Sequence, residues 1–401
     1  MAKDTVLEPP DEPGNANATS AATGLAPSSE PQSVVKANFG DDDRVNVASQ
    51  WTLMWWKFRK HRLAVISLWI VVGLYLTAIL VEPIAPYDPE QQDVRSAYQP
   101  PTAIHLWDMQ GNFHGPFVYG TTRRRNLETL SQEYAEDTTK VYPIKLFVQG
   151  TPYNLWGIIP MERHLFGVDD PGRVFLFGAD RQGRDMFSRV VYGTRISMSV
   201  GLIGVVLSFV LGIIFGGISG FYGGWLDTLI QRVIEILRSI PTIPLWMGLS
   251  AALPPNWPPL QVYFGVTVIL SLVGWTGLAR VVRGRFLSLR EEDFVMAAKL
   301  SGTSEKVIVF KHLVPSFTSH IIASLTLAVP EMILSETALS FLGLGLRFPA
   351  ISWGVLLQEA QNIRSVAEAP WLLAPAGAVV LAVLALNFLG DGLRDAADPY
   401  R

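Results

Sequence analysis

The feature that most constrains this chain is a series of apolar runs long enough to cross a bilayer. A helix needs about 20 apolar residues to span a hydrocarbon core of about 30 Å. Six segments of the 401-residue sequence fit, and together they predict an all-α polytopic membrane protein with six transmembrane helices: 63–84, 196–218, 225–253, 262–279, 317–344 and 371–389. A mean hydropathy of +0.28 leaves room for a sizeable polar part.

The chain before the first apolar run divides into two parts. Residues 1–48 are rich in Pro, Ala, Ser, Asn and Asp and carry too little apolar surface to offset the entropy of ordering, so we expect a disordered cytoplasmic tail. Residues 49–85 then hold an interfacial segment and the first transmembrane helix. Tryptophans interleave there with Lys57, Arg59, Lys60 and Arg62, and this basic cluster indicates the inner side of the membrane.

The longest polar stretch, residues 86–177, follows the first run and should be an extracytoplasmic insert with some β-structure. Ile144, Leu146 and Val148 alternate with their neighbours, a turn is expected at residues 150–152, and residues 153–156 resume the pattern, which predicts a β-hairpin. The chain has no Cys, so disulfides cannot stabilise this part. Seven aromatic residues should instead form a small core: Trp107, Phe113, Phe117, Tyr119, Phe147, Tyr153 and Trp156.

Composition and motifs exclude several functions. The net charge of −3 shows no basic bias, so nucleic acid is not an expected partner. The sequence contains no G-x-x-x-x-G-K-[ST] loop for holding ATP phosphates, no H-E-x-x-H pair and no G-x-S-x-G elbow. We therefore expect no catalytic residue, no bound metal and no bound cofactor in this chain.

A basic loop at residues 280–315 lies between two apolar runs and should face the cytoplasm. Phe294, Ala297 and Ala298 recur at helical spacing, and Gly302 should end that helix. A second short helix, capped by Ser304, should then lead to Pro315. Two short helices joined at a glycine form a compact projection, and a projection of this kind is suited to docking on another protein.

These residues carry a resemblance to a known family. The loop resembles the EAA loop of ABC importer permeases, with Met296 where many members have Glu, through Phe294, Met296, Ala297, Ala298, Gly302, His312 and Pro315. The segments 178–195, 227–245 and 339–354 resemble permeases of the dipeptide and oligopeptide class. The resemblance implies the type I ABC importer permease fold, a core permease domain over residues 178–401 and a loop that docks on an ATPase.

The same resemblance implies an assembly in a bacterial inner membrane, with both termini of this chain cytoplasmic. The partners would be a second homologous permease, two ATPase subunits that hold ATP and Mg, an extracytoplasmic solute-binding protein and membrane lipid. The chain would form half of a pathway for oligopeptides. Oligosaccharides or another small solute remain the alternative, because selectivity in this family rests largely with the binding protein.

Polar residues at membrane depth are further candidates. Asp227, Gln231, Glu235 and Arg238 share one helical face, and Glu331 and Glu336 follow in the fifth run. Charges in hydrocarbon are costly, so Glu235, Arg238, Glu331 and Glu336 are candidate pathway or gate residues. An ion pair of Glu235 with Arg232 or Arg238 is the alternative. Membrane carboxylates also suit an ion-coupled secondary transporter, which is the remote rival.

Small residues recur at every fourth position through the second apolar run, at Gly204, Ser208, Gly212, Gly216 and Gly220. In lipid, small residues at this spacing let two helices approach closely. We therefore expect a helix-packing face, with a channel-lining stripe as the alternative.

Overall fold

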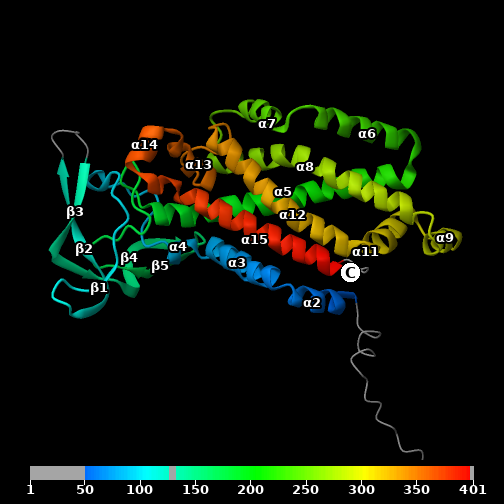
Figure 1. The fold of residues 1–401 in the computed structure, drawn as a ribbon. Coiled ribbons are helices and arrows are strands. Elements are labelled where there is room, and N and C mark those ends of the chain that lie inside the picture. Colours follow the sequence, from blue (N-terminus) through cyan, green and yellow to red (C-terminus); the bar gives the residue numbers. More distant parts are fainter. Residues whose placement is uncertain (1–49, 126–131, 398–401) are drawn as a thin grey trace, which may run out of the picture. The chain divides into compact units, whose positions relative to one another are not determined.

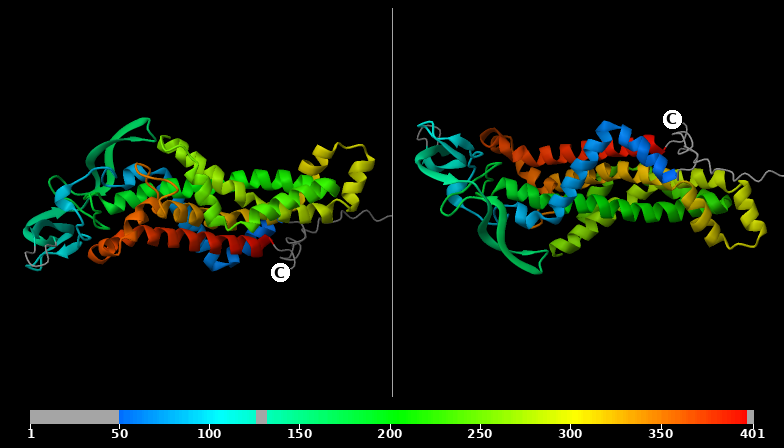
Figure 2. Two further views of the ribbon diagram at one scale, coloured as in Figure 1. Left: turned by 90° about the horizontal axis from the view of Figure 1, so that it is seen from above. Right: turned by 90° about the horizontal axis from the view of Figure 1, so that it is seen from below.

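The structure, a computed structural model, describes residues 50–125 and 132–397. The predicted tail at residues 1–48 lies outside the described residues. Long helices run side by side, the strands gather at one end of them, and the short helix α9 lies at the other end (Figure 1). Views from above and below show the same two ends (Figure 2).

Five helices among the described residues are long and apolar enough to cross a membrane. The long helices are α3 Arg62–Ile79, α5 Met186–Tyr222, α8 Pro259–Leu289, α12 Thr318–Phe341 and α15 Ala374–Ala397. The largest departures from the predicted limits are in α5, which begins ten residues early, and in α8, which continues ten residues past the apolar run. The Asp185 carboxylate caps α5 by accepting a hydrogen bond from the Ser188 N–H, which explains the early start.

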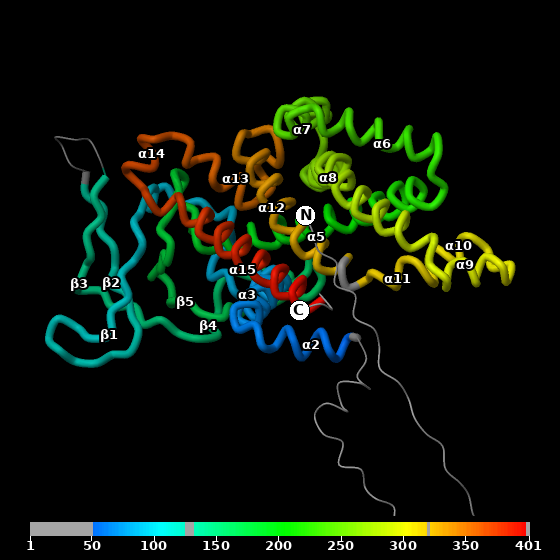
Figure 3. Tube along the Cα trace, turned by 45° about the vertical axis from the view of Figure 1, so that its right-hand side comes forward, coloured from blue at the N-terminus to red at the C-terminus, as the bar shows by residue number. Residues whose placement is uncertain are grey.

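The predicted third span, residues 225–253, is not one helix. It consists of α6 Gly224–Ser239 and α7 Thr242–Ala251, which lie beside α8 at the edge of the helices (Figure 3). Ile240 is extended, with φ −87° and ψ 130°, because the residue before a proline is pushed out of the helical region and Pro241 follows it. The break leaves neither piece long enough to count as a span by itself.

Shorter helical segments complete the described part, and they fall into two groups. The segments before α5 are α2 Gln50–Lys60, α4 Val81–Ile84 and η1 Val94–Ser96. The segments after α8 are α9 Asp293–Leu300, α10 Glu305–Val307, the π-helical η2 Ile308–Leu313, α11 Val314–Ser316, α13 Trp353–Gln358, η3 Glu359–Gln361, α14 Ile363–Glu368 and η4 Pro370–Leu373.

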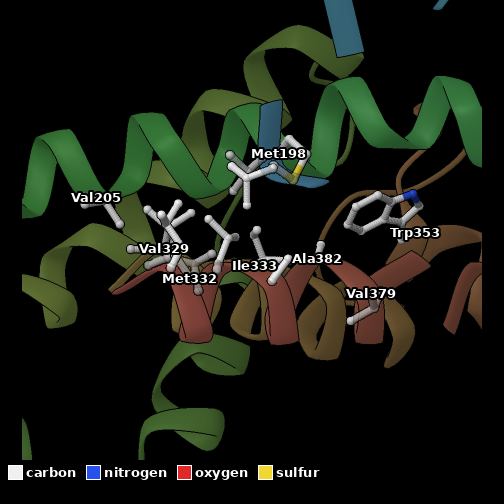
Figure 4. Packing of buried hydrophobic residues seen from close by; sticks show 14 of the residues in the cluster. Met198, Val205, Val329, Met332, Ile333, Trp353, Val379 and Ala382 are labelled. Atoms are coloured by element: carbon white, nitrogen blue, oxygen red, sulfur yellow. The ribbon is translucent and has the colours of Figure 1, made fainter. Parts of the chain in front are cut away.

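Helix α5 is the centre of the packing and contacts α8, α12 and α3. Met198 and Val205 of α5 meet Val329, Met332 and Ile333 of α12 in a buried apolar cluster that also includes residues of α15 (Figure 4). The predicted small-residue face is confirmed. A Cβ added at Gly204 would lie 2.9 Å from the Met332 side chain, and one added at Gly216 would lie 2.5 Å from the Ala279 carbonyl oxygen. These glycines therefore let α5 approach both α12 and α8.

The insert contains two small antiparallel sheets. The first has the order β1-β2-β3 and comprises β1 His105–Trp107, β2 Phe113–Arg125 and β3 Gln132–Pro143. The second pairs β4 Lys145–Leu155 with β5 Ile159–Gly167. The predicted hairpin exists, but its turn was misplaced: residues 150–152 form an irregularity within β4, and the chain turns at residues 156–158. Gly157 there has a φ of +72°, a conformation that favours glycine.

The predicted aromatic core of the insert is only partly right. Phe117 and Tyr119 are buried, with ring centroids 5.1 Å apart. Other aromatic side chains of the set are largely exposed, at 58% for Trp107, 66% for Phe113, 65% for Phe147 and 53% for Trp156. Two small sheets offer too few facing surfaces to cover seven rings.

Candidate functional site

The loop from α9 to α11 is fixed to the long helices by an apolar cluster. Val295 of α9 and Ile308 and Leu313 of η2 are buried, and they belong to one cluster with Phe286 of α8 and Phe317 at the start of α12. Apolar burial of this kind contributes about 1.5–3 kcal/mol for each large side chain. The loop is therefore packed against α8 and the start of α12.

Polar contacts attach the same loop to the end of α5. The Tyr222 hydroxyl donates a hydrogen bond to Glu305 Oε2 at 2.8 Å. The Lys299 ammonium lies 5.4 Å from the centroid of the Phe221 ring, within the range of a cation–π contact. The loop is thus linked to α5, α8 and α12.

The corner after α9 is built around Gly302. Its φ is +75°, its N–H donates to the Lys299 carbonyl at 3.0 Å, and the Thr303 N–H donates to the Ala298 carbonyl at 3.1 Å. These bonds satisfy carbonyl groups at the end of the helix. The prediction that the helix ends at Gly302 is confirmed.

The second predicted helix differs from expectation. Ser304 occupies the N-cap position of α10, but its side chain makes no capping hydrogen bond. The chain then continues as α10, the π-helical η2 and α11 in place of one regular helix up to Pro315. Proline has no N–H to donate, so the hydrogen-bond ladder cannot run unchanged through this position.

Above the anchored cluster, α9 exposes apolar side chains. We call Phe294, Met296, Ala297 and Leu300 the α9 surface. Phe294 is 42% exposed, Met296 47% and Leu300 86%. Of the other predicted residues, Ala298 and His312 are half-buried, and Gly302 and Pro315 are exposed. Leu300 was missed by the sequence analysis, although its spacing of four from Met296 could have revealed it.

The two carboxylates of α12 do not lie together. Glu336 is fully buried and accepts hydrogen bonds from the hydroxyls of Ser340 and Ser352 at 2.8 Å each and of Ser197 at 3.3 Å. It joins α12, α5 and the segment before α13. Glu331 is exposed on the outside of this chain.

The residues on the polar face of α6 have two kinds of surroundings. Asp227 accepts hydrogen bonds from Arg283 Nε and Nη2 of α8, both at 2.6 Å, which ties α6 to the other helices. Glu235 pairs with Arg232 at 2.7 Å, and both side chains are exposed. Arg238 is also exposed. The predicted ion pair of Glu235 therefore forms with Arg232. Other described residues leave the side chains of Glu235 and Arg238 exposed.

At the opposite end, residues 178–195 form a network of buried charges. Asp180 is fully buried and accepts hydrogen bonds from Arg184 Nε at 2.7 Å and from Arg189. Burial raises the pKa of the Asp185 carboxyl to about 6. The contacts of Asp180 with Arg184 and Arg189 lie within this chain. Within residues 50–125 and 132–397, no group of three or more His, Cys, Asp and Glu is placed to hold a metal ion.

The fold and the site define a class: a multi-pass helical membrane protein with an anchored loop that presents an apolar surface. Residues 209–400 match the family described as binding-protein-dependent transport system inner membrane component. Residues 49–101 match the N-terminal TM domain of oligopeptide transport permease C. The strands of the insert lie between these two matches.

Similar proteins include the dipeptide transport system permease protein DppC of Alkalihalophilus pseudofirmus, which is 40% identical over 233 residues, or 58% of this chain and 74% of the relative. The oligopeptide transport system permease protein OppC of Haemophilus influenzae is 41% identical over 224 residues, or 56% of this chain and 70% of the relative. This chain belongs to the permease family of dipeptide and oligopeptide ABC importers.

Among solved structures, one described as inward-facing conformations of the MetNI methionine ABC transporter covers 53% of this chain and 97% of its own, with 19% identity and a TM-score of 0.44. The family resemblance drawn from the sequence is confirmed by the family models and the relatives. The chain is a transport permease of the inner membrane.

Proposed function

We propose that this chain forms half of the translocation pathway for oligopeptides that an extracytoplasmic solute-binding protein delivers. A second homologous permease would form the other half, and two ATPase subunits would bind ATP and Mg. The names of the relatives support the peptide substrate, because they describe dipeptide and oligopeptide transport.

The α9 surface is the proposed docking site for one ATPase subunit. The observation that carries this proposal is the contrast across one short helix, in which Val295 is fully buried against α8 while Met296 and Leu300 are exposed. An isolated exposed loop would bend on contact. The anchored loop instead transmits displacement to α5, α8 and α12 as one body, which is what alternating access requires.

The proposed topology places the α9 end and both termini in the cytoplasm and the insert outside. The basic loop at residues 280–315 supports this orientation. In this topology α6 and α7 act together as the third of six spans. The exposed Glu235, Arg238 and Glu331 then face the pathway or the partner permease, while Glu336 positions helices within this chain.

Cross-linking tests the docking site directly, because the chain has no Cys and an introduced thiol is unique. We expect Ala297→Cys on α9 to cross-link to an ATPase subunit in the purified complex. Arg394→Cys, exposed at the end of α15, serves as the control and should not cross-link. Equal yields from both positions, or no product from Ala297→Cys in an assembled complex, would contradict the proposal.

A further inference from the structure

The tip of the β4–β5 hairpin is apolar and exposed. Residues 153–161 contain no charged side chain. Trp156 is 53% exposed, Ile158 79% and Ile159 46%. A folded domain surrounded by water does not favour such a cluster at a projecting turn.

A hydrogen bond holds this tip beside the end of α3. The Trp156 indole N–H donates to the Ile79 carbonyl at 2.8 Å. Arg195 of α5 donates to Glu82 Oε1 at 2.7 Å and also to the Ala78 carbonyl at 2.9 Å. The base of the hairpin is held as well, because the buried His164 ring contacts the Ala85 carbonyl at 2.6 Å.

Ile79 is the last residue of span α3, so the tip lies at the edge of the hydrocarbon layer. The 18 residues of α3 rise about 27 Å, close to the thickness of a bilayer core. Charged residues flank the apolar stretch of α3. Arg62 begins the helix, and Glu82 is the next charged residue along the chain. The uncharged stretch that follows Arg62 therefore ends between Ile79 and Glu82.

We propose that the β4–β5 tip inserts Trp156, Ile158 and Ile159 into the outer lipid surface beside α3. The occupant is lipid because the tip continues the surface of a span whose apolar window is only 17% buried within the chain. Tryptophan favours the interface, where its ring contacts lipid and its N–H keeps a polar partner. The tip then anchors the insert at a fixed height and orientation above the membrane.

Fluorescence quenching of the complete complex in nanodiscs tests this inference. Ile158→Cys and Met109→Cys each carry one environment-sensitive probe on the otherwise Cys-free chain. Met109 is a matched control because it is 81% exposed in the turn between β1 and β2, in a segment that contains Asp108. We expect the probe at position 158 to be quenched by phosphatidylcholine with a doxyl group near the headgroup, and severalfold less by iodide than the probe at 109.

Two outcomes would overturn the inference. Equal iodide quenching at 158 and 109 would place the tip in water. Protection of the probe at 158 from both iodide and doxyl lipid would show that a protein subunit covers the tip. In either case, membrane assembly of the complex provides the check that the variants fold.

Discussion

At the scale of single residues, two carboxylates five positions apart on α12 have opposite surroundings. Glu336 has no exposed surface and is hydrogen-bonded by hydroxyls of α5, α12 and the segment before α13, whereas Glu331 is exposed. Sequence position alone makes both residues candidates for a pathway. Burial distinguishes the two residues. Glu336 is enclosed by helices of its own chain and connects them through hydrogen bonds, whereas Glu331 lies on the surface of the chain.

Substitution of Glu336 tests this separation. Glu336→Leu leaves the hydroxyls of Ser340 and Ser352 without this acceptor, and each unpaired buried polar group costs about 1–3 kcal/mol. We expect a lower melting temperature for the purified complex. Glu336→Gln keeps polar atoms in the same place and should be milder, and Glu331→Gln should not change the melting temperature. Loss of uptake in Glu336→Gln at an unchanged melting temperature would instead indicate ion coupling.

The backbone conformation of Gly302 can be tested by substitution. A Cβ at this position would meet nothing within 4 Å, so the effect of a side chain is confined to its φ of +75°. A left-handed conformation costs about 1–2 kcal/mol for most residues. We expect Gly302→Leu to lower the amount of solute imported per ATP hydrolysed, and Gly302→Asn to do so less.

Gly284→Ala in α8 is the matched control, because its Cβ also meets nothing within 4 Å and its backbone is helical. Unchanged coupling in Gly302→Leu, with normal assembly, would show that the corner after α9 does not need this conformation.

At the scale of helices, the packing of α5 on α8 depends on backbone approach. Gly216 faces the Ala279 carbonyl and Gly220 faces the Arg283 carbonyl, so neither neighbour can move aside as a side chain could. The spacing of small residues predicted this face because the pattern is local. It did not predict the break at Pro241, because the apolar run of residues 240–253 continues through this proline.

Neighbouring glycines provide a test of the α5–α8 contact. A Cβ at Gly216 would lie 2.5 Å from the Ala279 carbonyl oxygen, whereas one at Gly217 would lie 3.5 Å from the Phe286 ring, an ordinary contact. We expect Gly216→Ala to destabilise the complex by about 1–3 kcal/mol through overpacking. Gly217→Ala should leave the melting temperature and the yield of assembled complex nearly unchanged, and equal effects of the two would contradict the packing described here.

At the scale of the whole molecule, the sequence predicted the membrane class, most spans and the α9 corner, because apolar runs and glycine punctuation are local signals. It predicted less of the insert. The turn at residues 156–158 and the exposure of Trp107 and Phe113 depend on which surfaces meet in three dimensions. The separation of Glu331 from Glu336 likewise depends on helix packing.

Transport by the reconstituted complex tests the central claim most directly. The complex of both permeases and the ATPases is placed in proteoliposomes with the binding protein, and uptake of labelled oligopeptide is measured with ATP, without ATP, and with an ion gradient alone. We predict uptake that requires ATP and the binding protein, exceeds uptake of an oligosaccharide, and is lost when this chain is omitted. Uptake by the complex with an ion gradient alone, in the absence of ATP, would contradict the account.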